Sequence, residues 1–553
     1  MKWFHSAVGY QVYPKSFCDA NGDGIGDLPG IISKLGYLQD LGVTLLWLGP
    51  IYASPMDDNG YDVSDFYDIA KEYGTMDDFH QLMSEAKAKG IRLVMDLVLN
   101  HTSDEHPWFI ESRSSLDNPK REYYLWAKGR VVDGVEVEPT NWASFFGGSC
   151  WQKDDITGEY YMKIFSSKMP DLNWQSKAMR EELYEMVRFW CDQGVSGFRV
   201  DAIAHLDRAP LVDSPMDHPG KYKPDWRQFS NRENVFDYLK ELHDVVAPLD
   251  VMTVGEVGGG ATLDEALRYV GHDEQRLDMV FTFDHNWKNG GWNSLHDDYQ
   301  PSLDLPGLKD DFARFQVGLY QKSWHALYWL NHDHPRVMSQ YGNVNFHKES
   351  GKMLATTLYF MWGTPFIYNG EEIGMTNADF TSLSDFQDVA LRRQYESLKD
   401  HYSDEQILRH FLVVSRDNSR TPMQWNDQPH AGFTTGTPWI KVNHNHRWLN
   451  VEAQQQEPDS ILNYYKTLFR VRNDVLSTVL YAPFELKESQ LFAYERPGDV
   501  RLLVISNFTD QELVYEHPVA IKRVLLQNYP DPVAGQPLTL RAYESVVLEV
   551  ENA

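Results

Sequence analysis

Three acidic residues follow three apolar runs of the chain: Asp201 closes GFRVD, Glu256 lies in VMTVGEV and Asp333 closes LYWLNHD. Each run has the length and composition of a buried strand. In a parallel αβ barrel the carboxyl ends of all strands open onto one face, so the three carboxylates would converge. Paired carboxylates suit glycoside hydrolysis, in which one attacks the sugar or activates water and the other protonates the leaving oxygen.

Cationic and imidazole side chains accompany these acids. Arg199 lies two residues before Asp201 and therefore points to the same face of its strand, where a guanidinium would keep Asp201 ionised and oriented. His101 ends the third predicted strand and His332 precedes Asp333, so both could bind sugar hydroxyls. A single strand-end acid more often caps the next helix, but three with such neighbours favour a functional site. No spacing of His and carboxylate residues supports a metal held here.

The segment DANGDGIGD at 19–27 has the alternating oxygens of a loop that binds a hard cation such as Ca²⁺. Gly24 allows a sharp turn, but Gly30 stands where the twelfth-position Glu of an EF-hand loop would be, and the loop follows a strand. The alternative is a polar turn without metal. We expect a structural metal without a catalytic role, held by Asp19, Asn21, Asp23, the carbonyl of Ile25, and Asp27.

The elements that must position these residues alternate between strand and helix patterns. ISKLGYLQDL precedes Gly42, and Thr75 with Asp78 opens a helix as a capping box. This rhythm predicts a (β/α)8 TIM barrel of class α/β. Its eight predicted strands are AVGYQVYPKSF, TLLWLGPIY, IRLVMDLVLN, GFRVDA, VMTVGEV, MVFTFDH, ALYWLNHD and TPFIYNGEE.

The rhythm stops twice, which predicts the domain organisation. Residues 1–100 and 174–479 form the two parts of the catalytic barrel, and its last helix follows a loop-rich stretch. Residues 101–173 are too long for a structureless loop, so they form an inserted small domain after the third strand, beside the active face. Residues 480–553 alternate in short runs, which predicts a C-terminal antiparallel β-sandwich.

Composition excludes several classes of partner. The chain has 553 residues and a net charge of −29, which disfavours nucleic acid and acidic membranes as partners. Its three cysteines lack the spacing of a disulfide framework or a zinc site. The N-terminus lacks the apolar region of a signal peptide, and no stretch is long enough to span a membrane. We expect a cytoplasmic protein, monomeric or a small homo-oligomer, without an organic cofactor, that acts on a small neutral saccharide.

The motifs together resemble a known family. DLVLNH (96–101), GFRVDAIAH (197–205), GEV (255–257) and NHD (331–333) are similar to the signature regions of glycoside hydrolase family 13, the α-amylase family. MPDLNW (169–174), GYDVSDF, GEEIGMTN and SRDNSRTPMQW resemble its oligo-1,6-glucosidase and α-glucosidase branch. The resemblance covers nearly the whole chain and implies a barrel with the inserted and C-terminal domains described above.

The resemblance implies roles for the three acids. Asp201 would be the nucleophile that forms a covalent β-glucosyl enzyme, and Glu256 would be the general acid and then the base. Asp333 would stabilise the transition state by holding sugar hydroxyls. Other side chains would line the same subsite: Arg199, His101 and His332.

The resemblance also implies how the substrate is held. Asp58 of DDNGYD and an arginine near RTPMQW would grip the non-reducing glucose; Arg416 matches, with Arg420 as its neighbouring candidate. Tyr61 would stack on that ring. A pocket closed beyond one glucose makes the enzyme exo-acting. The loop at 19–27 matches the family's Ca²⁺ or Mg²⁺ site.

Residues that flank the acids indicate the bond cleaved. In similar enzymes the residue after the nucleophile tends to be Val for α-1,6 linkages and Ala for α-1,4 linkages, and here it is Ala202. We therefore favour α-1,4 cleavage of maltose and short maltooligosaccharides. Met169 and His334 stand where the branch usually has Gln. Glycines 258–260 replace bulkier residues, which predicts a wider acceptor side and transglucosylation at high substrate concentration.

The same motifs are also compatible with other functions. An oligo-1,6-glucosidase, a trehalose-6-phosphate hydrolase and a sucrose isomerase share nearly all of them, although the RLDRD-type run associated with sucrose isomerases is absent. A non-catalytic binding protein on the same fold is a more remote alternative. Relatives of that kind lack the complete Asp, Glu, Asp set and carry a membrane anchor.

Overall fold

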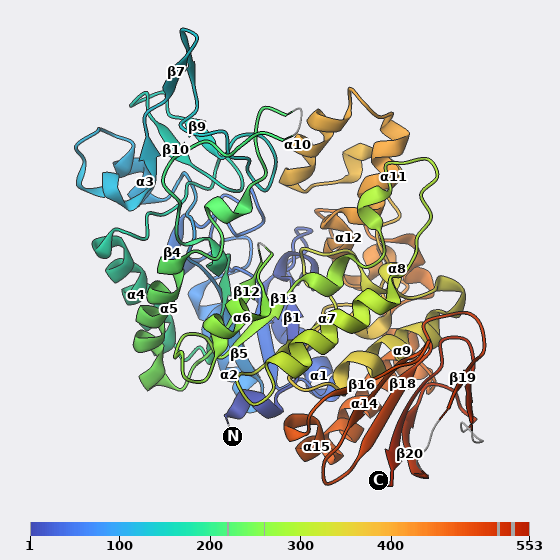
Figure 1. Ribbon diagram of the computed structural model, residues 1–553. Helices are drawn as coiled ribbons and strands as arrows, with labels where there is room; N and C mark the ends of the chain where they lie inside the picture. Colours follow the sequence, from blue (N-terminus) through green and yellow to red (C-terminus); the bar gives the residue numbers. More distant parts are fainter. Residues whose placement is uncertain (1, 218–219, 259, 517–519, 532–536, 552–553) are drawn as a thin grey trace.

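The computed structural model describes residues 2–217, 220–258, 260–516, 520–531 and 537–551, and its centre is an eight-stranded parallel sheet (Figure 1). The strand order is β13-β12-β11-β5-β2-β1-β15-β14, and a parallel bridge between Val280 and His325 joins the two ends. The predicted (β/α)8 barrel is therefore confirmed. Its strands are β1 Gly9–Val12, β2 Leu45–Leu48, β5 Arg92–Val98, β11 Gly197–Asp201, β12 Met252–Val257, β13 Met279–Thr282, β14 Ala326–Leu327 and β15 Thr364–Tyr368.

Helices follow the strands and have well-defined ends. Asp27 caps α1 by accepting a bond from the Gly30 backbone N–H (2.6 Å), and Gly42, at φ +94°, ends it. Thr75 and Asp78 form the predicted capping box of α2. The main helices around the barrel are α1 Leu28–Leu41, α2 Met76–Ala88, α4 Lys177–Asp192, α5 Glu233–Val246, α6 Leu263–Val270, α7 Leu305–Gly318, α9 His347–Tyr359 and α14 Ile461–Asp474.

The structure differs from the prediction after the seventh strand. The run ALYWLNHD was predicted to be one strand, but β14 ends at Leu327 and Asp333 lies six residues beyond it. The reason is a turn centred on Asn331, whose Oδ1 accepts bonds from the Asp333 backbone N–H (2.9 Å) and from the His334 ring Nδ1 (2.7 Å). The segment remains buried, so its apolar composition did not distinguish a buried loop from a strand.

The stretch before the last barrel helix was predicted to be rich in loops, but it contains four α-helices: α10 Val389–Leu398, α11 Asp404–Val414, and the short α12 Asp417–Arg420 and α13 Val451–Gln456. The start signals of the first two were present in the sequence. Asp388 caps α10, and Ser403 forms a capping box with Gln406 at the start of α11.

Residues 101–173 follow β5 and form a small unit at the same end of the barrel as α10 and α11 (Figure 1). Its apolar cluster also takes Ala209 and Phe229 from the segment after β11, so the insertion does not build its core alone. Its elements are α3 Pro107–Ser112, a sheet of β6 Trp126–Ala127, β10 Tyr160–Met162 and β9 Trp151–Lys153, and the hairpin β7 Arg130–Val132 with β8 Val135–Val137.

The C-terminal segment is antiparallel, as predicted. Two hydrogen bonds connect this segment to Thr357 of α9. The Thr357 Oγ1 donates to Ser506 Oγ (2.8 Å), and the Thr357 carbonyl accepts from the Tyr494 hydroxyl (3.0 Å). Two sheets form the segment, one of β16 Glu485–Lys487, β17 Phe492–Arg496, β18 Leu502–Ser506, β22 Ser545–Val550 and β20 Ile521–Gln527, the other of β19 Leu513–Tyr515 and β21 Leu538–Leu540.

Within the described ranges, none of the helices combines the length and the apolar character needed to cross a bilayer.

Candidate active site

The three predicted carboxylates meet in one pocket at the carboxyl ends of the barrel strands. Its volume is about 320 Å³, near the lower end of the range for small-molecule sites. Asp201 is the last residue of β11 and Glu256 lies near the end of β12, which is the neighbouring strand. Asp333 reaches the pocket from the loop after β14. The pocket is also lined by most of the other predicted residues: Asp58, Tyr61, His101, His332 and Arg416.

Arg199 contacts two of the three acids, Asp201 and Glu256. Its guanidinium is fully buried, and Nη1 donates to Asp201 Oδ1 (2.8 Å) while Nη2 donates to Glu256. The same Nη1 also donates to Asp96, which pairs with Arg199 in the β5–β11 register. Asp96 was not predicted as a site residue. Its signal in the sequence was a lone acid inside the apolar run IRLVMDLVLN.

Burial shifts the ionisation of the two acids that Arg199 bridges. It raises the pKa of Glu256 to about 7, with Arg199 opposing the shift and the charges of Asp201 and Asp333 adding to it. Burial likewise raises the pKa of Asp201 to about 7, against the effect of Arg199. Because the two groups interact, the proton belongs to the pair. At neutral pH the pair can hold one proton, which leaves one carboxylate ionised and one carboxylic acid.

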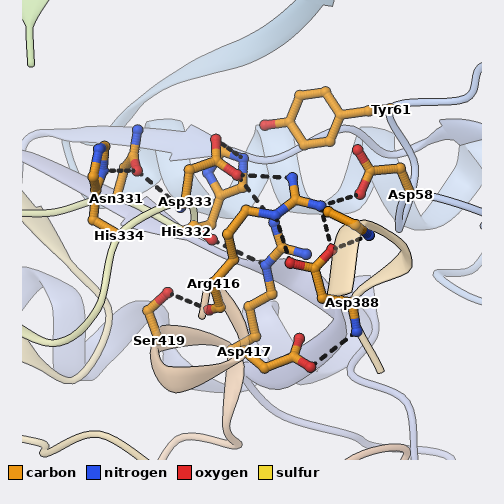
Figure 2. Close-up of polar contacts among 12 residues, drawn as sticks. Asp58, Tyr61, Asn331, His332, Asp333, His334, Asp388, Arg416, Asp417 and Ser419 are labelled. Atoms are coloured by element: carbon orange, nitrogen blue, oxygen red, sulfur yellow. Dashed lines mark hydrogen bonds and ion pairs between the residues drawn. The ribbon is translucent and has the colours of Figure 1, made fainter. Parts of the chain in front are cut away.

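Asp333 is ionised in its surroundings. Burial opposes this, but His332, Arg416 and Arg420 hold the pKa of Asp333 well below its usual range. Its Oδ1 accepts bonds from Arg420 (3.0 Å) and Arg416 (3.2 Å), and Oδ2 lies 3.1 Å from His332 Nε2. Figure 2 shows the contacts with Arg416 and His332. Burial lowers the pKa of His332, against the attraction of the Asp333 carboxylate. Asp333 therefore presents a fixed negative charge to the pocket.

An ion-pair network joins two residues that line the pocket, Asp58 and Arg416, to Asp388. Arg416 donates from Nη2 to Asp58 Oδ1 (3.0 Å) and from Nε to Asp388 Oδ2 (2.8 Å) (Figure 2). Arg420, the neighbouring candidate, does not contact Asp58 but donates from Nε to the His332 carbonyl (2.9 Å). Asp388 was missed because it lies in the segment predicted to be a loop. It was detectable only as a helix N-cap.

Tyr61 and His101 line the pocket and also contact the protein. The Tyr61 ring stacks on His332, with centroids 5.1 Å apart, and its hydroxyl donates to Asp96 (3.1 Å). His101 Nε2 lies 3.2 Å from the Tyr61 carbonyl, and its Nδ1 lies 3.2 Å from the Asn100 side-chain nitrogen. Burial lowers the pKa of His101 to about 3, so its ring is neutral. Contacts of these two rings with a sugar remain predictions.

The loop at 19–27 is folded by its own side-chain oxygens. Asp19 accepts bonds from the Gly22 and Gly24 N–H groups (2.7 and 2.8 Å), and Asp23 accepts one from Ile25 (2.8 Å). Gly24 is required, because a Cβ there would lie 1.8 Å from the Thr437 carbonyl oxygen. The donors are all oxygens, which suits a hard cation. Among the described residues, however, no group of three or more His, Cys, Asp or Glu side chains is arranged to hold a metal. The structural metal therefore stays a prediction.

The predicted metal can be tested by thermal unfolding. At a free Ca²⁺ concentration one hundred times Kd, a site specific to the folded state adds about 2.7 kcal/mol to the free energy of unfolding. We expect Ca²⁺ to raise Tm by several degrees over the value in a chelator. Asp23 is exposed, so Asp23→Ala should abolish the rise while changing Tm in the chelator little. Equal Tm values with and without Ca²⁺ or Mg²⁺ in the unsubstituted protein would rule the metal out.

A parallel eight-stranded barrel whose strand ends bring together two carboxylates on one arginine, with a third beside them, defines the protein as a glycoside hydrolase of the barrel type. The family model for the α-amylase catalytic domain matches residues 11–480, and the chain belongs to this family, glycoside hydrolase family 13. The resemblance in its motifs is thereby confirmed.

Known proteins similar to the chain include two hydrolases and a synthase. The oligo-1,6-glucosidase of Bacillus cereus is 44% identical over the whole of both chains. The trehalose-6-phosphate hydrolase of Bacillus subtilis is 42% identical over 99% of this chain and 98% of its own. The crystal structure of isomaltulose synthase from Klebsiella sp. LX3 has a TM-score of 0.93 and 37% identity, with full coverage of both chains.

Proposed function

We propose that the protein is a retaining, exo-acting α-glucosidase that releases glucose from the non-reducing end of short α-glucosides. The observation that carries the proposal is the single guanidinium of Arg199 that contacts both Asp201 and Glu256. Two carboxylates bound to one guanidinium are held close together, as a retaining mechanism needs, at roughly 5–5.5 Å. The network of Arg416 with Asp58 and Asp388 supports exo action, because it closes the pocket beyond one sugar.

In the proposed reaction, Asp201 attacks the anomeric carbon of the terminal glucose and forms a β-glucosyl ester. Glu256 gives its proton to the glycosidic oxygen, and the shortened saccharide leaves. The Glu256 carboxylate then takes a proton from water, whose oxygen attacks the same carbon and releases Asp201 and α-glucose. Asp333 binds sugar hydroxyls and stabilises the positive charge that develops on the ring.

The charges around the pocket favour a neutral substrate. Arg416 is the only Lys or Arg among the described residues that line it, and its donors already contact Asp58, Asp333 and Asp388. A phosphate on the leaving sugar would therefore find no available cation in the pocket. This supports an α-glucosidase over a trehalose-6-phosphate hydrolase, despite the similarity to one.

Two linkages compete, and we favour α-1,4. Ala202 lines the pocket directly after Asp201, and its backbone lies in the left-handed region at φ +49°. A β-branched residue is strained at such a φ, so the small side chain fits this backbone and leaves room beside the bond that is cleaved. The second candidate, α-1,6 cleavage, is favoured by the name of the Bacillus cereus relative.

We expect the protein to cleave maltose faster than isomaltose and Ala202→Val to reduce the ratio of the two kcat/KM values. A change of this size in a pocket alters the ratio of the kcat/KM values for two substrates by about 10- to 200-fold. The measurement is kcat/KM on both disaccharides, with sucrose, trehalose and trehalose 6-phosphate as further substrates. Faster cleavage of isomaltose by the unsubstituted protein would overturn the α-1,4 assignment but keep the glucosidase.

Transglucosylation is proposed for the same pocket. Gly258 lines it, and a Cβ there would approach the Phe283 ring to 3.3 Å, so the glycine keeps the acceptor side open. Gly259, the next residue of the predicted glycine run, lies outside the described residues. Trisaccharides should therefore form from concentrated maltose, and free glucose as the sole product would contradict transfer.

A further inference from the structure

A row of aromatic rings begins at the open side of the pocket. Phe283 lines the pocket together with Glu256 and Gly258 and follows directly after β13. Its ring centroid lies 5.5 Å from that of His334, which lies 5.7 Å from that of Trp287. Trp287 in turn lies 4.6 Å from Trp292. The row therefore runs through four rings from the pocket residue Phe283 to Trp292.

Exposure differs along this row, and the His334 ring is only 5% exposed. Phe283 and Trp287 are half-buried, whereas 53% of Trp292 is exposed to solvent. Three of the rings belong to the segment after β13, which is a loop at the carboxyl ends of the barrel strands, and these loops form the active face. Single exposed apolar residues are common on protein surfaces, but a ring of this size at the end of a continuous row from the pocket is not isolated.

The ring of His334 is part of the row rather than a charged group. Burial lowers the pKa of His334 to about 4, so the imidazole is neutral at physiological pH. Its Nδ1 bonds to Asn331 Oδ1 (2.7 Å), which fixes the ring between Phe283 and Trp287. The glutamine usual at this position would not supply such a ring.

We propose that Phe283, Trp287 and Trp292, with the buried His334 ring packed between the first two, form an extended binding track for the leaving side of the substrate, so that the enzyme prefers oligosaccharides longer than a disaccharide. The inference rests on the proposed function, because the closed end at Asp58 and Arg416 holds the non-reducing glucose and directs the remaining sugars outward. Flat aromatic faces with one wet side suit the apolar faces of glucosyl units. The occupant of the track is the substrate's own chain.

The test is kcat/KM over maltose, maltotriose, maltotetraose and maltopentaose, repeated with the isomalto series. For the unsubstituted enzyme we expect kcat/KM to rise with chain length beyond the disaccharide. Trp292→Ala should remove roughly 2- to 10-fold from the longest substrates and leave the disaccharide unchanged. Trp292→Phe should keep most of the gain, since it retains a ring.

Trp448 provides a matched control, because it is 60% exposed, contacts His347 and does not line the pocket. Trp448→Ala should leave the whole series unchanged. The track is refuted if Trp292→Ala keeps the chain-length profile of the parent or lowers all lengths equally. If the unsubstituted protein cleaves no α-glucoside of either series, the proposed function fails instead.

Discussion

Replacement of Asp201 by Asn should reduce kcat on maltose by about 10⁴- to 10⁶-fold, which is the range seen when a catalytic nucleophile is removed. The carboxamide cannot form the glucosyl ester, so the first chemical step is lost. The fold should survive, because Asn has nearly the same shape and Arg199 keeps its contacts with Asp96 and Glu256. The measurement is kcat on maltose, together with Tm to confirm that the variant is folded.

Asp207 serves as the matched control for this substitution. It is buried, lies six residues further along the chain and does not line the pocket. Asp207→Asn should keep kcat within a few-fold of the parent. An Asp201→Asn variant with more than about one per cent of the parent kcat would contradict the nucleophile assignment, since that loss is far smaller than the loss of a nucleophile.

Replacement of Glu256 by Gln should reduce kcat/KM on maltose by about 10²- to 10⁴-fold, the usual contribution of a general acid. The loss should be much smaller for the glycosylation step with α-glucosyl fluoride, because fluoride leaves without a proton. The difference between the two substrates separates loss of the acid from general damage to the pocket. An equal loss on both would show that Glu256 is not the proton donor.

The pH dependence follows from the raised pKa values of the two acids. Above its pKa of about 7, Glu256 is ionised and cannot donate a proton, so kcat/KM on maltose falls as pH rises. Below its pKa of about 7, Asp201 is protonated and cannot attack, so kcat/KM falls as pH decreases. We expect a narrow bell near neutral pH, whose limbs describe the pair rather than each residue. In Glu256→Gln the alkaline limb should disappear from the residual kcat/KM on maltose, and its persistence would contradict the assignment.

Much of the fold was predictable because most barrel strands are short apolar runs followed by a helix, and several of these helices have recognisable caps. Asp201 and Glu256 were placed at neighbouring strand ends because their strands follow one another in the chain and in the sheet. The seventh strand was overestimated because the side chain of Asn331 turns the chain while its neighbours stay buried. The apolar composition of a segment indicates that it is buried, but it does not indicate whether its backbone pairs in a sheet.

Contacts in the site between residues far apart in the sequence were harder to predict. Arg416 contacts Asp58 across 358 residues, and only the resemblance to a family suggested that they belong together. Asp388 had no such motif, and its bond to Arg416 emerges only when the chain after β15 returns to the pocket. Asp96 could have been suspected, because a lone acid in a buried strand requires a partner.

We propose that Asp201 forms a covalent bond to glucose, and this bond can be trapped and located. The protein would be treated with 5-fluoro-α-glucosyl fluoride, whose ring fluorine slows breakdown of the ester, and then digested and analysed by tandem mass spectrometry. We expect a fluoroglucosyl group on Asp201 in the peptide that contains GFRVDAIAH, and no adduct in Asp201→Asn. An adduct on Glu256 or Asp333, or release of β-glucose from maltose without any adduct, would contradict it.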